Sequence, residues 1–97
     1  MDTATVNAYD LSQDLLELAG YEVSEDTDQP GLYVWTREEK GRMVAGCDSS
    51  LASAEEAWDE VRFMVAEVLF EEANVSPAEW KELSAEQRQS IITEEFC

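Results

Sequence analysis

The chain has no histidine, two cysteines and six basic residues among its 97. Without histidine it lacks the commonest general base and a common zinc ligand, and no CxxC pair is present instead. Neither cysteine stands in a basic cluster that would activate its thiol as a nucleophile. These absences predict a protein that is not an enzyme and that holds no metal and no cofactor.

The cysteines are Cys47 and Cys97, and their spacing does not show whether they pair. We expect Cys47 to be a small buried residue at a strand end and Cys97 to be loose. Residues 1–12 lack the basic and apolar regions of a signal peptide, and no apolar run approaches the roughly 18 residues of a membrane span. A reduced, cytoplasmic chain is therefore expected.

Basic residues are few because acids dominate: 23 acids against six bases give a formal net charge of −17. This charge argues against binding to bare nucleic acid or to anionic membranes, both of which need lysine and arginine. It favours a cationic partner, such as a nucleic-acid-binding protein. The alternative is an acidic surface that only keeps the protein in solution. A hydrophobic fraction of 44% supplies enough apolar residues for one folded domain over residues 1–97.

The longest helical pattern covers residues 53–73. Its apolar residues recur at steps of three and four, which places them on one side of a helix. A second apolar strip lies beside the first, so we expect a central helix that is covered on two sides. The first strip contains Ala54, Ala57, Trp58, Val61, Val65, Val68 and Leu69, and the second contains Phe63, Ala66, Phe70 and Ala73.

One helix and a small antiparallel sheet are expected before the central helix. Residues 1–7 resemble a loose leader, and periodicity predicts a helix over residues 8–19 with Gly20 in the left-handed conformation after it. Tyr33 and Trp35 are two apart on a strand and are expected to face the core together. We expect strands over residues 21–23, 32–36 and 42–47, a loop over residues 24–31 and a hairpin connection over residues 37–41.

Serine residues mark the start of each helix from the central one onward. Ser53 precedes Glu56 by three residues, Ser84 precedes Gln87 by three, and Ser76 stands before Pro77. These signals predict helices over residues 77–83 and 84–96, which form a hairpin against the second apolar strip through Trp80, Leu83, Ile91, Ile92 and Phe96. The fold class is therefore α+β: an N-terminal helix, an antiparallel sheet of two or three strands, a long central helix and a C-terminal helical hairpin.

Residues 26–31 resemble the first half of an EF-hand calcium loop. Pro30 occupies the fifth ligand position, and Arg37 occupies the twelfth, where a bidentate glutamate is needed. An acidic turn is the better interpretation.

The acidic residues of the central helix are the candidate partner-binding site. Glu56, Glu60, Glu67 and Glu71 fall near one line along the helix, about 6 Å apart within each pair and about 10 Å between pairs. Such spacings are comparable with those of phosphates on a nucleic-acid strand, although any exposed acidic helix shows them. The array is predicted to extend through Asp10, Asp14 and Glu17 of the first helix and through Glu22, Glu25, Asp26 and Asp28.

A chain of this size and charge, with a small sheet around residues 33–35 and the helix start at residues 53–58, resembles the small accessory proteins of phages and mobile elements. These include anti-CRISPR proteins and other DNA-mimic inhibitors, and the likeness is one of size, charge and layout. It implies an inhibitor that occupies the basic nucleic-acid-binding channel of a host defence complex, such as a CRISPR–Cas effector. The alternative is an interaction module or adaptor that docks through an apolar helical surface made of Trp80, Phe96 or the Phe63 and Phe70 strip.

Overall fold

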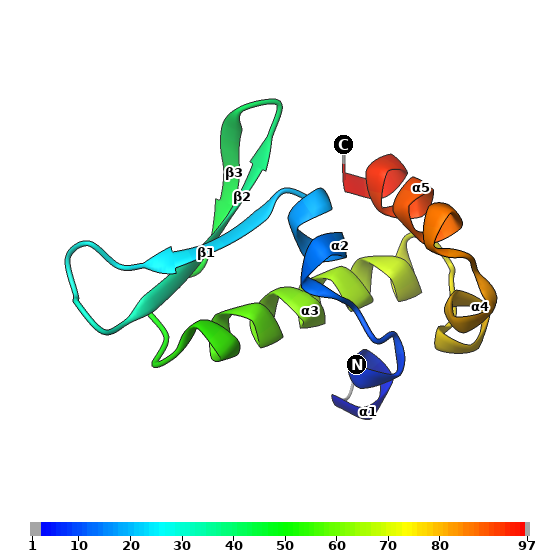
Figure 1. Ribbon diagram of the computed structural model, residues 1–97, viewed down its shortest axis with the longest axis horizontal. Coiled ribbons are helices and arrows are strands. Elements are labelled where there is room, and N and C mark those ends of the chain that lie inside the picture. Colours follow the sequence, from blue (N-terminus) through cyan, green and yellow to red (C-terminus); the bar gives the residue numbers. More distant parts are fainter. Residues whose placement is uncertain (1–2, 97) are drawn as a thin grey trace.

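The computed structural model describes residues 3–96 and has an α+β architecture, as predicted (Figure 1). A three-stranded sheet lies against one end of a long helix, and short helices cover the rest of that helix. None of the helices within residues 3–96 is both long and apolar enough to cross a bilayer. The elements are α1 Thr3–Ala8, α2 Gln13–Leu18, β1 Tyr21–Glu25, β2 Tyr33–Glu39, β3 Arg42–Gly46, α3 Ala54–Glu71, α4 Pro77–Glu82 and α5 Ala85–Phe96.

The N-terminal region differs from the prediction of a loose leader and one helix over residues 8–19. Two short helices, α1 and α2, are separated by a turn in which Asp10 has a φ of 50°. Ser12 begins α2, because its side chain accepts a hydrogen bond from the Leu15 N–H group. Val6 and Tyr9 are buried, so α1 is anchored to the core. The prediction of a helix over residues 8–19 is wrong because Tyr9 was counted as part of the apolar side of that helix. Its side chain is buried, but the residue lies in the turn between α1 and α2.

The hydroxyl of Tyr9 donates a hydrogen bond to the carbonyl oxygen of Val75, which ties the N-terminal turn to the segment after α3. Burial raises the pKa of Tyr9 above its usual 10.0, and Glu79 raises it further. An ionised tyrosine is thus less favourable in the folded chain than in the unfolded one. This contribution to stability is complete below pH 10 and is lost as the pH rises through the tyrosine range.

We therefore expect Tyr9→Phe to lose about 1 kcal/mol of unfolding free energy at neutral pH, the net value of one hydrogen bond. The loss of stability on moving to alkaline pH should also be smaller in this variant. Urea unfolding at neutral and alkaline pH measures both effects. If Tyr9→Phe loses as much stability at alkaline pH as the wild type does, the alkaline loss is caused by other groups. Tyr21 is one such group, because burial also raises its pKa.

The sheet is antiparallel with the strand order β1–β2–β3. Strand β2 runs to Glu39, so the expected connection over residues 37–41 shrinks to a two-residue turn. Lys40 and Gly41 have φ values of 53° and 79°, which the tightest hairpin turns require at both central positions. A bulge between Arg37 and Glu38 shifts the β2–β3 register. Because β1 and β3 are both edge strands, each leaves one row of backbone groups without a neighbouring strand.

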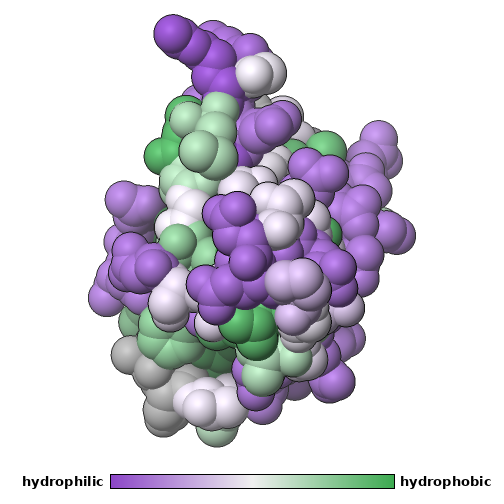
Figure 2. Space-filling model, turned by 90° about the vertical axis from the view of Figure 1, so that its left-hand side faces the viewer, coloured by the Kyte–Doolittle hydropathy of each residue, from purple (hydrophilic) through white to green (hydrophobic). Residues whose placement is uncertain are grey.

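Strand β3 is the most exposed part of the sheet. Met43 is 68% exposed and Val44 is 50% exposed, and the hairpin that carries them projects from the body of the molecule (Figures 1 and 2). The base of the hairpin is anchored in the core, since Trp35 of β2 is 4% exposed, as predicted. Cys47 follows β3, is half-buried against the core and is a free thiol, whereas Cys97 lies outside the described residues.

Helix α3 supplies the centre of the core, as its periodicity predicts. Ala57, Val61, Val65 and Leu69 are fully buried beneath the sheet and the N-terminal helices. The side chain of Ser53 accepts a hydrogen bond from the Glu56 N–H group and begins the helix, as expected. Serine caps also begin α4 at Ser76 and α5 at residue 84.

The C-terminal helices do not pack where the sequence placed them. Helix α4 packs on α1, and α5 packs on α2, rather than on the second strip of α3. The ring of Trp80 meets that of Tyr9 edge-on at 6.2 Å between centroids. Within the second strip, Phe63 and Phe70 remain 38% and 49% exposed. The expectation that this strip is covered is therefore wrong at its two largest residues.

Candidate partner-binding surface

Four glutamates form a row along the outer side of α3, which we call the acidic ridge: Glu56, Glu60, Glu67 and Glu71. All four are exposed, as predicted. The buried residues of α3 lie on the other side of the helix, so the row faces away from the core.

Two residues of the acidic ridge also have structural roles. Glu56 accepts a hydrogen bond from the Ala52 N–H group at 3.2 Å, which completes the N-terminal cap of α3. Glu60 accepts one from the indole Nε1 of Trp35 at 3.0 Å. Because Trp35 is otherwise buried, this bond satisfies its only polar group and fixes the Glu60 carboxylate above β2. These two positions are therefore poor choices for charge reversal.

Glu67 and Glu71 have no structural role of the kind that Glu56 and Glu60 have. They line a shallow hollow of about 270 Å³ on α3 together with Met64, Val68 and Glu72. Within residues 3–96, neither carboxylate makes a hydrogen bond or an ion pair, so both are available to a partner.

The charge of the acidic ridge is not neutralised by the protein itself. In the described part of the chain, the ion pairs are Arg37 with Glu39 and Arg62 with Asp59. Arg62 is the only base on α3, and its Nε atom is also held by the Leu11 carbonyl oxygen at 3.0 Å. It is thus directed toward the N-terminal turn and away from the ridge.

The other predicted site residues do not extend the ridge into one continuous surface. Asp10 lies in the turn between α1 and α2, and Asp14 lies in a hollow between α2 and α5. Glu17 accepts a hydrogen bond from Gln13 at 2.8 Å and faces a groove beside β1. Helical spacing placed Asp14 and Glu17 on one element, but only the packing of α2 decides which surface each residue joins.

Asp26 and Asp28 are used within the loop between β1 and β2. One Asp26 oxygen accepts a hydrogen bond from the Asp28 N–H group at 2.9 Å, and the other accepts one from the Ser50 hydroxyl. The Ser50 bond, followed by that of Asp28, lowers the pKa of Asp26 below its usual value. This carboxylate therefore tethers the loop to the segment before α3. Over residues 3–96, no three potential metal-ligating acids, cysteines or histidines come together.

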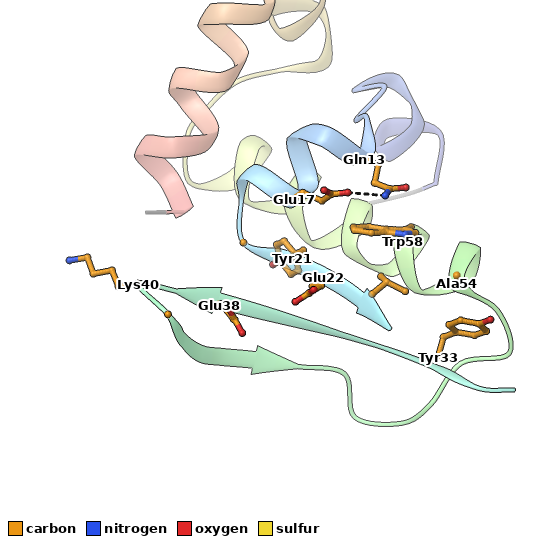
Figure 3. A pocket seen from close by; sticks show the side chains of 12 residues that line it. Gln13, Glu17, Tyr21, Glu22, Tyr33, Glu38, Lys40, Ala54 and Trp58 are labelled. Carbon is orange, nitrogen blue, oxygen red and sulfur yellow. Dashed lines mark hydrogen bonds between the residues drawn. The ribbon is translucent and has the colours of Figure 1, made fainter. Parts of the chain in front are cut away.

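Two further features of the surface involve aromatic residues. The first is the exposure of Phe63 and Phe70, which lie two turns apart on α3 and belong to the strip that the alternative interpretation named as a docking surface. The second, which was not predicted from the sequence, is the groove beside β1, which is lined by Trp58 and Tyr33 among others (Figure 3). Both aromatic residues fitted the core pattern, and no local signal distinguishes a core residue from one that also borders a groove.

Comparison with known proteins gives no further identification: no family model, no curated protein and no solved structure matches the chain.

Proposed function

We propose that the protein is a non-enzymatic inhibitor that binds the cationic nucleic-acid-binding surface of a host defence complex, such as a CRISPR–Cas effector in a bacterial cytoplasm. The observation that carries this proposal is the acidic ridge, whose charge no base of the described chain neutralises. The net charge of −17 adds a long-range attraction to such a partner.

A basic channel binds nucleic acid largely by replacing the counterions of phosphates with lysine and arginine. A rigid row of carboxylates at similar separations offers the same channel an alternative ligand. The ridge is built on the longest helix and is held at Glu60 by Trp35, so its spacing is fixed before binding. The protein would then compete with DNA for one surface and would need no catalysis.

The test uses purified CRISPR effector complexes and other DNA-binding complexes with labelled target DNA, to which the protein is added at increasing concentration. We expect displacement of DNA from one of them. Glu67→Lys combined with Glu71→Lys should weaken that inhibition by about ten-fold or more, because each reversal replaces an attraction with a repulsion. Direct binding measured at low and high salt should weaken with salt, since exposed charges are screened.

The matched control is Glu94→Lys combined with Glu95→Lys, which makes the same change in charge on α5. Both of these residues are exposed and close to the C-terminal end of the helix, where lysine is tolerated. This control should lose much less activity than the ridge variant. Equal losses would mean that net charge alone matters, and binding that does not depend on salt would contradict the proposal.

A second candidate function is an interaction module that docks through apolar residues. The exposure of Phe63 and Phe70 beside the ridge supports it, whereas the burial of Trp80 and Phe96 removes them as contacts. A double variant, Phe63→Ser with Phe70→Ser, separates the two functions. If it abolishes partner binding while the Glu67 and Glu71 reversals do not, the apolar module is the better description.

A further inference from the structure

A groove of about 660 Å³ lies between α2, β1 and the start of α3 (Figure 3). Its walls are Gln13 and Glu17 of α2, Glu22 and Val23 of β1, and Ala54 and Trp58 of α3. Figure 3 shows β1 running along the groove, with Gln13 and Trp58 above the strand and Tyr33 beyond its end. The volume lies within the range of ordinary ligand sites.

One wall of the groove is an unpaired strand edge. The Glu38 N–H group donates to the Gly20 carbonyl oxygen, and the Asp26 N–H group donates to that of Leu32, so even-numbered residues around β1 face β2. By the two-residue period of a strand, the backbone groups of the odd-numbered residues face away. Tyr21 is buried beneath α2, but Val23 and Glu25 are not. Their N–H and C=O groups can therefore pair with another strand.

The surroundings of this edge select for positive charge. Glu17 stands on the α2 side and Glu22 on β1, both exposed, with Glu38 farther along the groove. Trp58 and Tyr33 offer aromatic rings, on which a guanidinium or ammonium group can stack. The one base lining the groove is Lys40, which lies at the hairpin tip and extends away from β1 (Figure 3).

We propose that this groove binds an extended, basic peptide segment of a partner protein, which adds a fourth strand to the sheet along Val23 and Glu25. Alternate side chains of such a strand fall on opposite faces of the sheet. Those on one face lie beside Glu22, and those on the other meet Trp58 and Glu17. The strand edge supplies affinity through main-chain hydrogen bonds, and the acids and rings select arginine or lysine. The proposal does not depend on the acidic ridge, which is a different surface of α3.

The test uses the full chain, labelled with ¹⁵N, and a short acetylated peptide of alternating arginine and threonine. With about nine-tenths of the protein occupied, we expect the Val23 and Glu25 amides to exchange with solvent about ten-fold more slowly, since exchange then occurs only from the free fraction. The indole N–H signal of Trp58 should shift in the same titration. Unchanged exchange at Val23 and Glu25 with a bound peptide would overturn strand addition.

Two matched controls separate this site from general attraction to an acidic protein. The same peptide with an N-methyl group at every residue keeps its charge but loses its backbone donors along both strand edges, so it should not protect Val23 and Glu25. Glu17→Gln combined with Glu22→Gln should weaken binding of the unmodified peptide by about two- to thirty-fold, the range for two exposed ion pairs.

Glu67→Gln combined with Glu71→Gln removes the same charge from the ridge and should leave peptide affinity nearly unchanged. If this ridge variant loses as much affinity as the groove variant, the peptide binds by net charge and the proposed site is wrong. Because the assay contains no nucleic-acid-binding complex, its outcome is separate from that of the DNA-displacement test.

Discussion

Trp80→Ala is expected to lower the free energy of unfolding by about 3–5 kcal/mol, the usual cost of deleting a large buried aromatic side chain. Trp80 is fully buried in α4. Its ring meets Tyr9 of the N-terminal turn, and the guanidinium carbon of Arg88 lies 5.5 Å from its centre. The substitution therefore leaves a cavity where three separate segments join. Since the total free energy of unfolding of a small domain is about 5–15 kcal/mol, this substitution would remove much of the stability.

Urea unfolding followed by far-ultraviolet circular dichroism measures this loss. Trp80→Phe is the matched variant, because it keeps a six-membered aromatic ring in the core and removes the five-membered part of the indole with its N–H group. Within residues 3–96 that N–H has no hydrogen-bond partner, so its removal sacrifices no bond. We expect Trp80→Phe to cost about 1–3 kcal/mol, less than alanine, because the cavity that it leaves is smaller. A cost as large as that of alanine would mean that the volume of the cavity does not determine the loss of stability.

Gly20→Ala is expected to cost about 2–5 kcal/mol, because it combines two penalties. Gly20 has a φ of 99°, outside the region that alanine prefers, which costs about 1–2 kcal/mol. A Cβ atom at this position would also lie 2.3 Å from the carbonyl oxygen of Glu38, so the backbone of β2 would have to move. Gly20 joins α2 to β1 and accepts the Glu38 N–H bond at 2.9 Å, and the groove would be disturbed with it.

Gly31→Ala provides the control for the second penalty. Gly31 also has a positive φ, 88°, but among residues 3–96 no atom other than those of Gly31 and its two chain neighbours lies within 4 Å of the place that a Cβ atom would take. Only the conformational cost should appear, about 1–2 kcal/mol in the same urea measurement. If both variants lose equal stability, a small shift of the chain relieves the contact between the new Cβ atom and the Glu38 carbonyl oxygen. The close approach of Gly20 to Glu38 would then not be what requires glycine between α2 and β1.

Local chemistry explains what the sequence predicted well. Ser53 and Ser76 cap helices because each serine is followed by N–H groups that need an acceptor, and Gly20 is left-handed because it ends a helix. Signals of this kind lie within a few residues of one another. The α+β class follows from them together with the periodicity of α3 and the β-branched and aromatic residues of β2.

Tertiary packing explains what the sequence could not predict. Periodicity shows that Phe63 and Phe70 share a side of α3 but not that α5 packs elsewhere and leaves them exposed. For the same reason Glu17 faces a groove and does not continue the acidic ridge. The groove joins residues from 13 to 58, so it exists only after the sheet and helices have come together.

The exposed edge of β3 has a consequence for how copies of the protein behave in concentrated solution. Met43 and Val44 lie on an uncovered strand, which is the kind of element through which sheets of different molecules join. The excess of carboxylates makes copies of the protein repel one another. This repulsion opposes pairing between edge strands of two molecules, which in other proteins a helix covering the edge prevents. In acid, as the carboxylates become neutral, that colloidal protection fades and self-association along β3 becomes favourable.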